Sequence, residues 1–416
     1  MEQNNITDIS LASAECRELK NGVKIYTLNS DEFEVLRVTF VFGAGSVMQH
    51  KPFAATSTAN MLCEGTAEMN AHQIAERLDY YGSYFDVNID RDYTYISFCS
   101  LTKFVEPTLD VAAQIILHPI FDERELEIYA AKRKQRLKIE REKVETRARE
   151  EFAKSLFGAA HPYAESFSED EYDNLTRDDL VKTYERLYIA ENCFVVCSGR
   201  VGEYEMESIE RIAEALPQGV KPAARDLTKV EQRRYFLTPK QGAVQSSIRI
   251  GRLLFGRSHP DFVGMQILSS LLGGYFGSRL MRTLREERGY TYGVMSAMVN
   301  FAHAGYFAVA TQVAVEVVDD ALKLIYEEIE RLRTEPISPE ELEMVKRIMK
   351  GEIMRVLDGP FGVADVTIEN ILCGRDNDAI EENVRAIEAA TPEDLMTLAQ
   401  KYLDFDDLVT VVSGAR

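Results

Sequence analysis

Hydrophobic and polar positions in the first half of the chain predict strands followed by alternating helices and strands. Two apolar, β-branched runs lie near the N-terminus, and two later runs alternate with a period of two, as in a hairpin. Asn70 is placed to cap a helix that ends at Tyr81, where Gly82 stops it. The predicted strands are 24–28, 35–42, 84–90 and 93–101, and the predicted helices are 70–81, 109–117 and one very long polar helix over 123–157.

The second half repeats this order. Matching residues of the two halves are separated by a constant number of positions, which indicates an internal duplication. Thr176 and Thr391 each precede a similar helix, 215 positions apart, and Gly199 and Gly414, each closing an apolar run, are separated by the same 215 positions. Two homologous copies of about 200 residues can each bury a core of their own. In the second copy the predicted strands are 245–250 and 306–312, and the predicted helices are 318–333 and 339–357.

The segment between the copies has two prolines, one glycine and no hydrophobic period, which is typical of a linker. The predicted domains are therefore 1–216 and 227–416, joined by a linker over 217–226. Strands mixed with long helices, without a strict alternation of strand and helix, favour an α+β fold. Each domain is expected to have a mostly antiparallel sheet with helices packed on one face.

Composition narrows the class of protein. The 416 residues include 68 acidic and 48 basic ones, a net charge of −20 that argues against non-specific nucleic-acid binding. The six cysteines have no framework spacing, which predicts reduced thiols in a reducing compartment. No apolar run approaches the roughly 18 residues of a membrane span. The N-terminal residues lack the basic and apolar regions of a signal peptide, so a cytoplasmic protein is expected.

Two short patterns could form ligand-binding sites, but a purely structural interpretation is favoured for each. The segment Gly273-Gly-Tyr-Phe-Gly277 could cradle a phosphate, but it fits neither nucleotide-binding fingerprint, and a flexible loop at a helix entry is favoured. His72 and Glu76 have helical spacing and could share a metal. No third ligand lies nearby in the sequence, so a surface pair is favoured.

A third pattern places an arginine and a tyrosine on either side of a turn. Arg285 precedes Gly289 and Tyr292 follows it, at the junction of a basic helix end and an aromatic strand. A guanidinium and a phenol on one concave wall can bind peptide carbonyl oxygens or a carboxylate. A structural arginine and a core tyrosine would give the same spacing, and the residues alone favour that plainer interpretation.

Several motifs together resemble the pitrilysin/insulinase peptidase family, in particular its branch that includes mitochondrial processing peptidase. Leu19-Lys-Asn-Gly-Val23 is similar to the opening strand of that family, and Phe42-Gly-Ala-Gly-Ser46 is similar to the turn before its metal helix. Leu284-Arg-Glu-Glu-Arg-Gly-Tyr-Thr-Tyr292 resembles the signature of its second domain. The resemblance covers nearly the whole chain and implies two homologous α+β domains that face each other across a cavity.

The resemblance fails at the metal motif of the family. Active members carry H-x-x-E-H on a helix, and the matching positions here hold Thr56, Ala59 and Asn60. A hydroxyl and an amide do not replace zinc-binding imidazoles, and alanine cannot act as a general base. Glu140 matches the distal glutamate ligand, but one carboxylate does not make a zinc site. We expect no metal and no catalytic residue in this chain.

The resemblance assigns Arg285 and Tyr292 to binding of the substrate backbone, and it matches Phe85, Asp86 and Val87 to an edge strand along which a peptide adds. It implies a non-catalytic, substrate-binding subunit of a two-chain zinc metallopeptidase. The H-x-x-E-H partner would hold the zinc, and the substrates would be peptides or unfolded segments. The isolated chain could also form a homodimer. The alternatives are a structural scaffold without a peptidase partner and, least favoured, an autonomous metallopeptidase with a relocated metal site.

Overall fold

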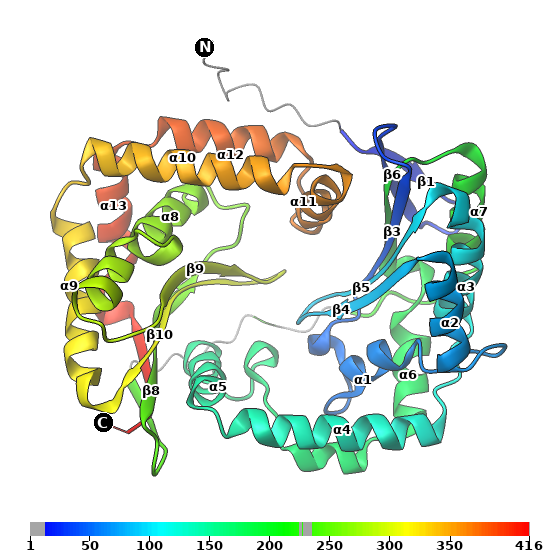
Figure 1. The fold of residues 1–416 in the computed structure, drawn as a ribbon, viewed down its shortest axis with the longest axis horizontal. Coiled ribbons are helices and arrows are strands. Elements are labelled where there is room, and N and C mark those ends of the chain that lie inside the picture. Colours follow the sequence, from blue (N-terminus) through cyan, green and yellow to red (C-terminus); the bar gives the residue numbers. More distant parts are fainter. Residues whose placement is uncertain (1–12, 224–226, 228–234, 416) are drawn as a thin grey trace.

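A computed structural model of the protein describes residues 13–223, 227 and 235–415. The N-terminal segment in which no signal peptide was predicted, and the last three positions of the predicted linker, lie outside the described residues. Two β-sheets occupy opposite sides of the molecule, and each draws its strands from one half of the chain (Figure 1). Among the described residues, no helix is both long and apolar enough to cross a bilayer.

The strands of the first half form a six-stranded sheet in the order β1-β2-β6-β3-β5-β4, and those of the second half form a five-stranded sheet in the order β7-β11-β8-β10-β9. Each sheet contains one parallel pair, β2 with β6 and β7 with β11, and is otherwise antiparallel. The strands are β1 (Glu15–Glu18), β2 (Lys24–Asn29), β3 (Val35–Phe42), β4 (Tyr84–Ile89), β5 (Thr94–Leu101), β6 (Cys193–Gly199), β7 (Tyr235–Pro239), β8 (Gln245–Leu254), β9 (Val294–Asn300), β10 (Gly305–Ala314) and β11 (Val409–Gly414).

Each half of the chain also contributes its own set of helices. In the first half they are α1 (Ala54–Met61), α2 (Ala71–Tyr81), α3 (Val105–Leu117), α4 (Glu123–Arg141), α5 (Val144–Phe157), α6 (Arg177–Leu187) and α7 (Glu203–Glu214). In the second half they are α8 (Phe262–Ser269), the π-helical segments η6 (Ser270–Gly274) and η7 (Met281–Glu287), α9 (Val318–Thr334), α10 (Pro339–Val356), α11 (Pro360–Leu372), α12 (Asp378–Ala389) and α13 (Pro392–Tyr402).

The internal repeat is visible in matching helix caps and strand ends. Thr176 caps α6 by accepting a hydrogen bond from the backbone of Asp179, and Thr391 caps α13 by accepting one from Asp394. The last residues of β6 and β11, Gly199 and Gly414, both have positive φ angles, of 110° and 140°. The α+β fold class, with two similar halves, is thus confirmed.

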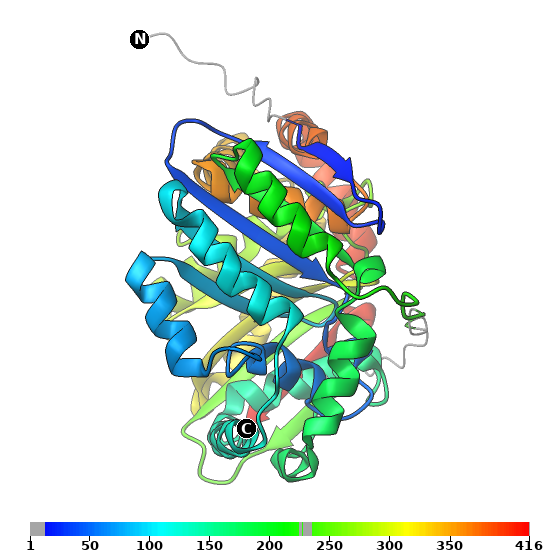
Figure 2. The ribbon, with the colours of Figure 1, turned by 90° about the vertical axis from the view of Figure 1, so that its right-hand side faces the viewer.

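Helices α2, α3 and α7 lie across the outer face of the first sheet, as predicted (Figure 2). The structure adds one exchanged helix to the inner face of each sheet. Helix α5, from the first half, packs on β8 and β11, and helix α11, from the second half, packs on β2 and β6 (Figure 1). The exchange buries Phe152 and Leu156 of α5 and Ala364 and Ile368 of α11, so the two halves hold each other.

This exchange explains why the single long helix predicted over 123–157 is wrong. The chain breaks between α4 and α5 at Lys143, whose backbone is extended with φ −82° and ψ 132°. Neither proline nor glycine occurs there, so the sequence contains no local signal for the break. Helix α4 buries little besides Leu126, whereas α5 buries Ala148 and Phe152 against the other half. Tertiary burial therefore overrides local helix propensity.

Candidate functional site

The helix that matches the metal helix of the family is α1, and its degenerate positions point in different directions. Ala59 is fully buried in the core, whereas Thr56 is partly exposed and lines a cavity of about 590 Å³. Asn60 Nδ2 donates a hydrogen bond of 2.7 Å to the carbonyl oxygen of Thr56. The amide at the second ligand position is thus used within its own helix.

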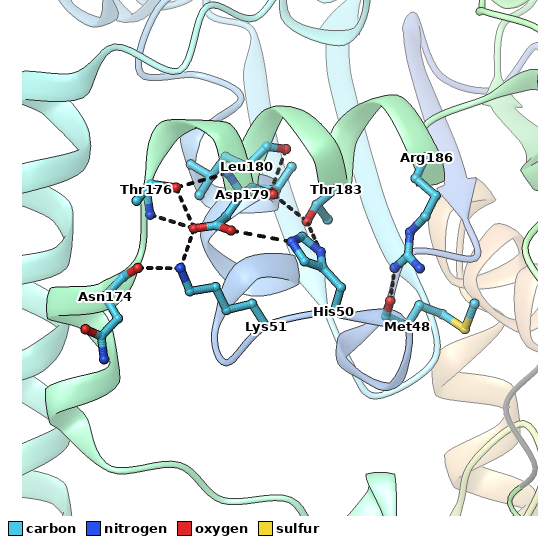
Figure 3. Close-up of polar contacts among 10 residues, drawn as sticks. Met48, His50, Lys51, Asn174, Thr176, Asp179, Leu180, Thr183 and Arg186 are labelled. Carbon is cyan, nitrogen blue, oxygen red and sulfur yellow. Dashed lines mark hydrogen bonds and ion pairs between the residues drawn. The ribbon is translucent and has the colours of Figure 1, made fainter.

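The loop that leads into α1 is fixed to α6 by a set of polar contacts (Figure 3). Lys51 Nζ lies 2.7 Å from Asp179 Oδ2, and His50 Nε2 lies 3.6 Å from Asp179 Oδ1. Arg186 donates to the carbonyl oxygen of Met48. Burial alone would raise the pKa of Asp179, but hydrogen bonds from Lys51 and Thr176 outweigh it and hold that pKa at about 2. This carboxylate therefore stays ionised and positions α1.

Glu140, the residue matched to the distal ligand, lines the same cavity as Thr56. Its Oε1 accepts a hydrogen bond of 2.9 Å from Arg136 Nε on the same helix, which lowers the pKa of Glu140. Ala59 and Asn60 do not line this cavity, whereas Arg133 and Arg136 do. The structure thus brings together Thr56 and Glu140, but it surrounds them with guanidinium groups.

These residues do not fit a zinc ion. A zinc site needs three or four imidazole, thiolate or carboxylate ligands around one point. Here Thr56 offers only a hydroxyl and Glu140 is paired with Arg136, and the other carboxylates that line the cavity, those of Asp90, Glu150 and Glu165, do not gather with it around one point. Across the part of the chain that the structure describes, no three His, Cys, Asp or Glu side chains gather in a way that could hold a metal. His72 and Glu76, the other metal candidate, form an exposed pair with a closest approach of 3.9 Å between Nδ1 and Oε2.

Tyr292 lies at a second cavity, of about 660 Å³, which we call the Tyr292 cavity. The side chain is 92% exposed, so the plainer interpretation of a core tyrosine does not hold. Arg285, on η7, places its guanidinium over the ring of Phe276, with Cζ 4.6 Å from the centroid, and Phe276 lines the cavity together with Tyr292 and Met295. The structure therefore brings the Arg285 side chain to the rim of the Tyr292 cavity.

The turn between Arg285 and Tyr292 is built by local hydrogen bonds. Gly289 takes a positive φ of 66°, and Tyr290 N donates to the carbonyl oxygen of Leu284 at 2.8 Å, which ends η7. Beyond the turn, Thr311 Oγ1 on β10 donates to the carbonyl oxygen of Gly293 at 3.0 Å. The backbone on both sides of Tyr292 is thus fixed while its side chain stays free.

The segment that leads into η7, beside the Tyr292 cavity, is fixed to α10 by an ion pair. Arg279 Nε and Nη2 donate to Glu341 Oε1 and Oε2 at 2.8 and 2.7 Å, in a two-pronged pair with the Arg279 side chain only 8% exposed. The segment before it, from Gly273, packs against β9, where an added Cβ on Gly273 would meet Ser296 N at 2.7 Å. Gly273 therefore serves close packing against a strand.

The strand predicted to be an edge strand, β4, does lie at one edge of the first sheet. Strand β4 pairs only with β5, and along it Phe85 and Val87 turn partly inward while Asp86 is exposed. Strand β9 occupies the matching edge of the second sheet and carries the exposed Met295. The two hairpin tips meet, because Asp92 Oδ2 accepts a hydrogen bond of 2.9 Å from the backbone of Ala302.

The sequence interpretation missed the polar residues that reach the Tyr292 cavity from β8. Gln245, Ser247 and Arg249 all line it and stand at alternate positions of one strand. Polar residues at alternate positions put their side chains on one face of a strand, and this period of two is a signal that could have identified them. Glu145 of α5 also lines the cavity, and only the helix exchange reveals that.

Comparison with known proteins decides the family. Residues 25–165 match the model described as insulinase (peptidase family M16), and residues 174–349 match the model described as peptidase M16 inactive domain. The chain belongs to peptidase family M16. This confirms the resemblance drawn from the motifs around Gly22, Gly45 and Tyr292.

Relatives of this M16 chain are similar over nearly their full length. An uncharacterized zinc protease of Bacillus subtilis, YmxG, is 22% identical over 397 residues, which cover 95% of this chain and 97% of that protein. A crystal structure of a peptidase M16 inactive domain from Pseudomonas fluorescens has a TM-score of 0.89 at 24% identity, covering 97% of this chain and 98% of the other. A chain of complex III2 from Candida albicans has a TM-score of 0.75 at 18% identity and covers 96% of this chain and 95% of its own. These structural likenesses show the fold.

Proposed function

We propose that this M16 chain is a non-catalytic, substrate-binding subunit of a two-chain zinc metallopeptidase. The observation that carries the proposal is the contrast between its two cavities. Beside the first cavity, helix α1 carries Thr56, Ala59 and Asn60 at the ligand and base positions, whereas the second cavity presents an exposed Tyr292 near Arg285. Zinc and the residue that activates water would come from a homologous subunit that carries H-x-x-E-H.

The Tyr292 cavity suits an extended peptide. Most of its lining is apolar, with Phe276, Val294 and Met295 on one side, and the open edge of β9 runs along it. A peptide added to a sheet edge is held mainly by main-chain hydrogen bonds, which tolerate many sequences. The Tyr292 hydroxyl and the Arg285 guanidinium are donors suited to peptide carbonyl oxygens. The edge of β4, with Phe85, Asp86 and Val87, would offer a second strand-like surface in the same complex.

The alternative function is that of a scaffold without a peptidase partner. It is favoured by one observation, the similar fold of a chain in complex III2 from Candida albicans. Under this alternative Arg285 and Tyr292 would have no ligand. The exposure of Tyr292 at the cavity favours the binding subunit, because a purely structural tyrosine gains nothing from 92% exposure.

Reconstitution tests the proposed function. The chain is purified alone, and again together with an M16 chain from the same organism that carries H-x-x-E-H, in a reducing cytoplasmic buffer. We expect a mixed complex that cleaves an unstructured peptide, zinc only in the partner, and no cleavage by this chain alone. Cleavage by the lone chain, or full activity of the partner without it, contradicts the proposal.

A further inference from the structure

Three arginines from separate elements meet at the place where the two halves join. Arg249 lies on β8, Arg149 on α5, and Arg91 in the turn between β4 and β5. All three line one small cavity of about 180 Å³, which we call the arginine pocket. In a chain with a net charge of −20, such a gathering of positive charge needs a specific explanation.

The described residues leave these guanidinium groups with few partners. Arg149 makes no hydrogen bond or ion pair with any described residue, and the buried Nε of Arg249 has no hydrogen-bond partner there either. The side chain of Arg249 is only 15% exposed, and its Nη2 lies 4.0 Å from Glu145 Oε1. Arg91 Nη1 donates to the carbonyl oxygen of Glu165 at a long 3.5 Å. Arg149 is exposed and Arg91 is half-buried, so the cost of an unpaired buried guanidinium falls on Arg249, and an anion would offset it.

The carboxylates around the arginine pocket do not neutralise all three guanidinium groups. Glu150 lines the pocket, but its Oε1 accepts from Arg141 Nε at 3.3 Å. Asp92 is bonded to Tyr163 Oη at 2.8 Å and to the backbone of Ala302. Glu145 lies on the side of the Tyr292 cavity, where it also accepts from Gln312 Nε2 at 3.0 Å. Glu165 also lines the pocket, and its charge raises the pKa of Arg91, so it offsets part of the positive charge there.

Electrostatics and shape both indicate a small anionic group. Burial lowers the pKa of Arg91 and of Arg249, and in both cases the charge of Arg149 lowers it further. An anion between them would relieve this repulsion. Aromatic side chains make up much of the remaining lining of the pocket; they belong to Phe152, Phe157, Tyr163, Phe301 and Tyr306. The volume suits one carboxylate with a few waters, since a water occupies about 30 Å³.

The arginine pocket lies between the two larger cavities: Arg249 lines both the pocket and the Tyr292 cavity, whereas Arg91 and Arg149 line both the pocket and the cavity beside Thr56. We propose that Arg91, Arg149 and Arg249 bind the C-terminal α-carboxylate of a peptide that lies along β9. This inference rests on the proposed function, and it names the substrate class: short peptides with a free C-terminus, bound by that end. Such anchoring would select cleavage products and small peptides over internal segments of long chains.

Binding of one labelled, mostly apolar short peptide to the full-length chain tests the inference, with the peptide prepared as the free acid and as the C-terminal amide. We expect the free acid to bind at least tenfold more tightly, because bidentate guanidinium contacts to a carboxylate are strong. In Arg149→Gln and Arg249→Gln the acid should fall to the affinity of the amide. Arg147→Gln, on the same helix but outside the pocket, is the matched control and should bind like the wild type.

The outcomes separate this inference from the proposed function. Equal binding of acid and amide to the wild type overturns the carboxylate site while leaving peptide binding intact. A preference for an internal aspartate over the free C-terminus assigns the pocket to a side-chain carboxylate and also overturns it. Acid-dependent binding that is insensitive to Arg285→Ala and Tyr292→Phe keeps the pocket but contradicts their proposed role. Failure of both peptides to bind overturns both.

Discussion

Asn60 and Thr56 occupy the two positions where active relatives would hold zinc, and here they are bonded to each other: Asn60 Nδ2 donates to the Thr56 carbonyl oxygen at 2.7 Å. The amide satisfies a carbonyl of its own helix instead of facing the cavity. Between them Ala59 is fully buried and presents only a methyl group to the core. This helix therefore contributes packing, and the amide of Asn60 is already used within it.

The first prediction concerns metal content. The chain purified alone should contain well below one zinc per molecule, and a chelator should leave its thermal unfolding midpoint unchanged, because only a ligand bound to the native state raises that midpoint. Elemental analysis and thermal unfolding with and without chelator measure this. Stoichiometric zinc whose removal lowers the midpoint would show a ligand set elsewhere in the chain.

The second prediction concerns Arg285 and Tyr292 in the mixed complex. Tyr292→Phe removes one donor and should lower kcat/KM by about tenfold, while Arg285→Ala should lower it by about 10- to 100-fold, since contacts of a charged donor are stronger. Arg282→Ala changes an exposed arginine of the same segment and serves as the control. Size-exclusion chromatography should show unchanged assembly. Turnover equal to the wild type in both variants would contradict a substrate role.

The third prediction concerns the pair that supports η7. Arg279→Ala leaves Glu341 partly buried without its partner and should destabilise the chain by about 3 kcal/mol. Denaturant unfolding measures the loss, with Lys323→Ala, from the exposed pair with Glu327, as a control that should cost less than about 1 kcal/mol. An equal small effect for both variants would mean that the Arg279 pair contributes little to holding the cavity wall.

The fourth prediction concerns acid stability at α6. The folded-state pKa of Asp179, about 2, lies below its ordinary value of 3.8, so its contribution is present above about pH 4 and is lost as pH falls toward 2. Asp179→Asn should therefore destabilise the chain by about 1–2 kcal/mol at pH 7, allowing for solvent screening, and by less at pH 3.

Thermal unfolding of the wild type and Asp179→Asn across this pH range measures the difference. Asp178→Asn changes the exposed neighbour in the same helix turn and is the matched control. A gap between wild type and Asp179→Asn that stays constant from pH 7 to pH 3 would rule out the ion pair with Lys51 as its cause.

Much of the fold followed from local sequence because local chemistry determines it. The strand over 35–42 and the helix from Asn70 to Gly82 appear as predicted, since an apolar, β-branched run and a capping pair need no distant partner. The break at Lys143 could not be predicted, because the burial that causes it belongs to the other half of the chain. The same applies to Glu145, which reaches the Tyr292 cavity only through the exchange of α5.

The sequence by itself determined the duplication, the family and the loss of the metal motif, because spacing and residue chemistry are read directly from the chain. It left open whether Tyr292 was a core residue, and only the tertiary structure placed that side chain at a cavity rim with 92% exposure. The arginine pocket was likewise invisible in sequence. Arg91, Arg149 and Arg249 are far apart along the chain, and they converge only because each half packs a helix on the sheet of the other.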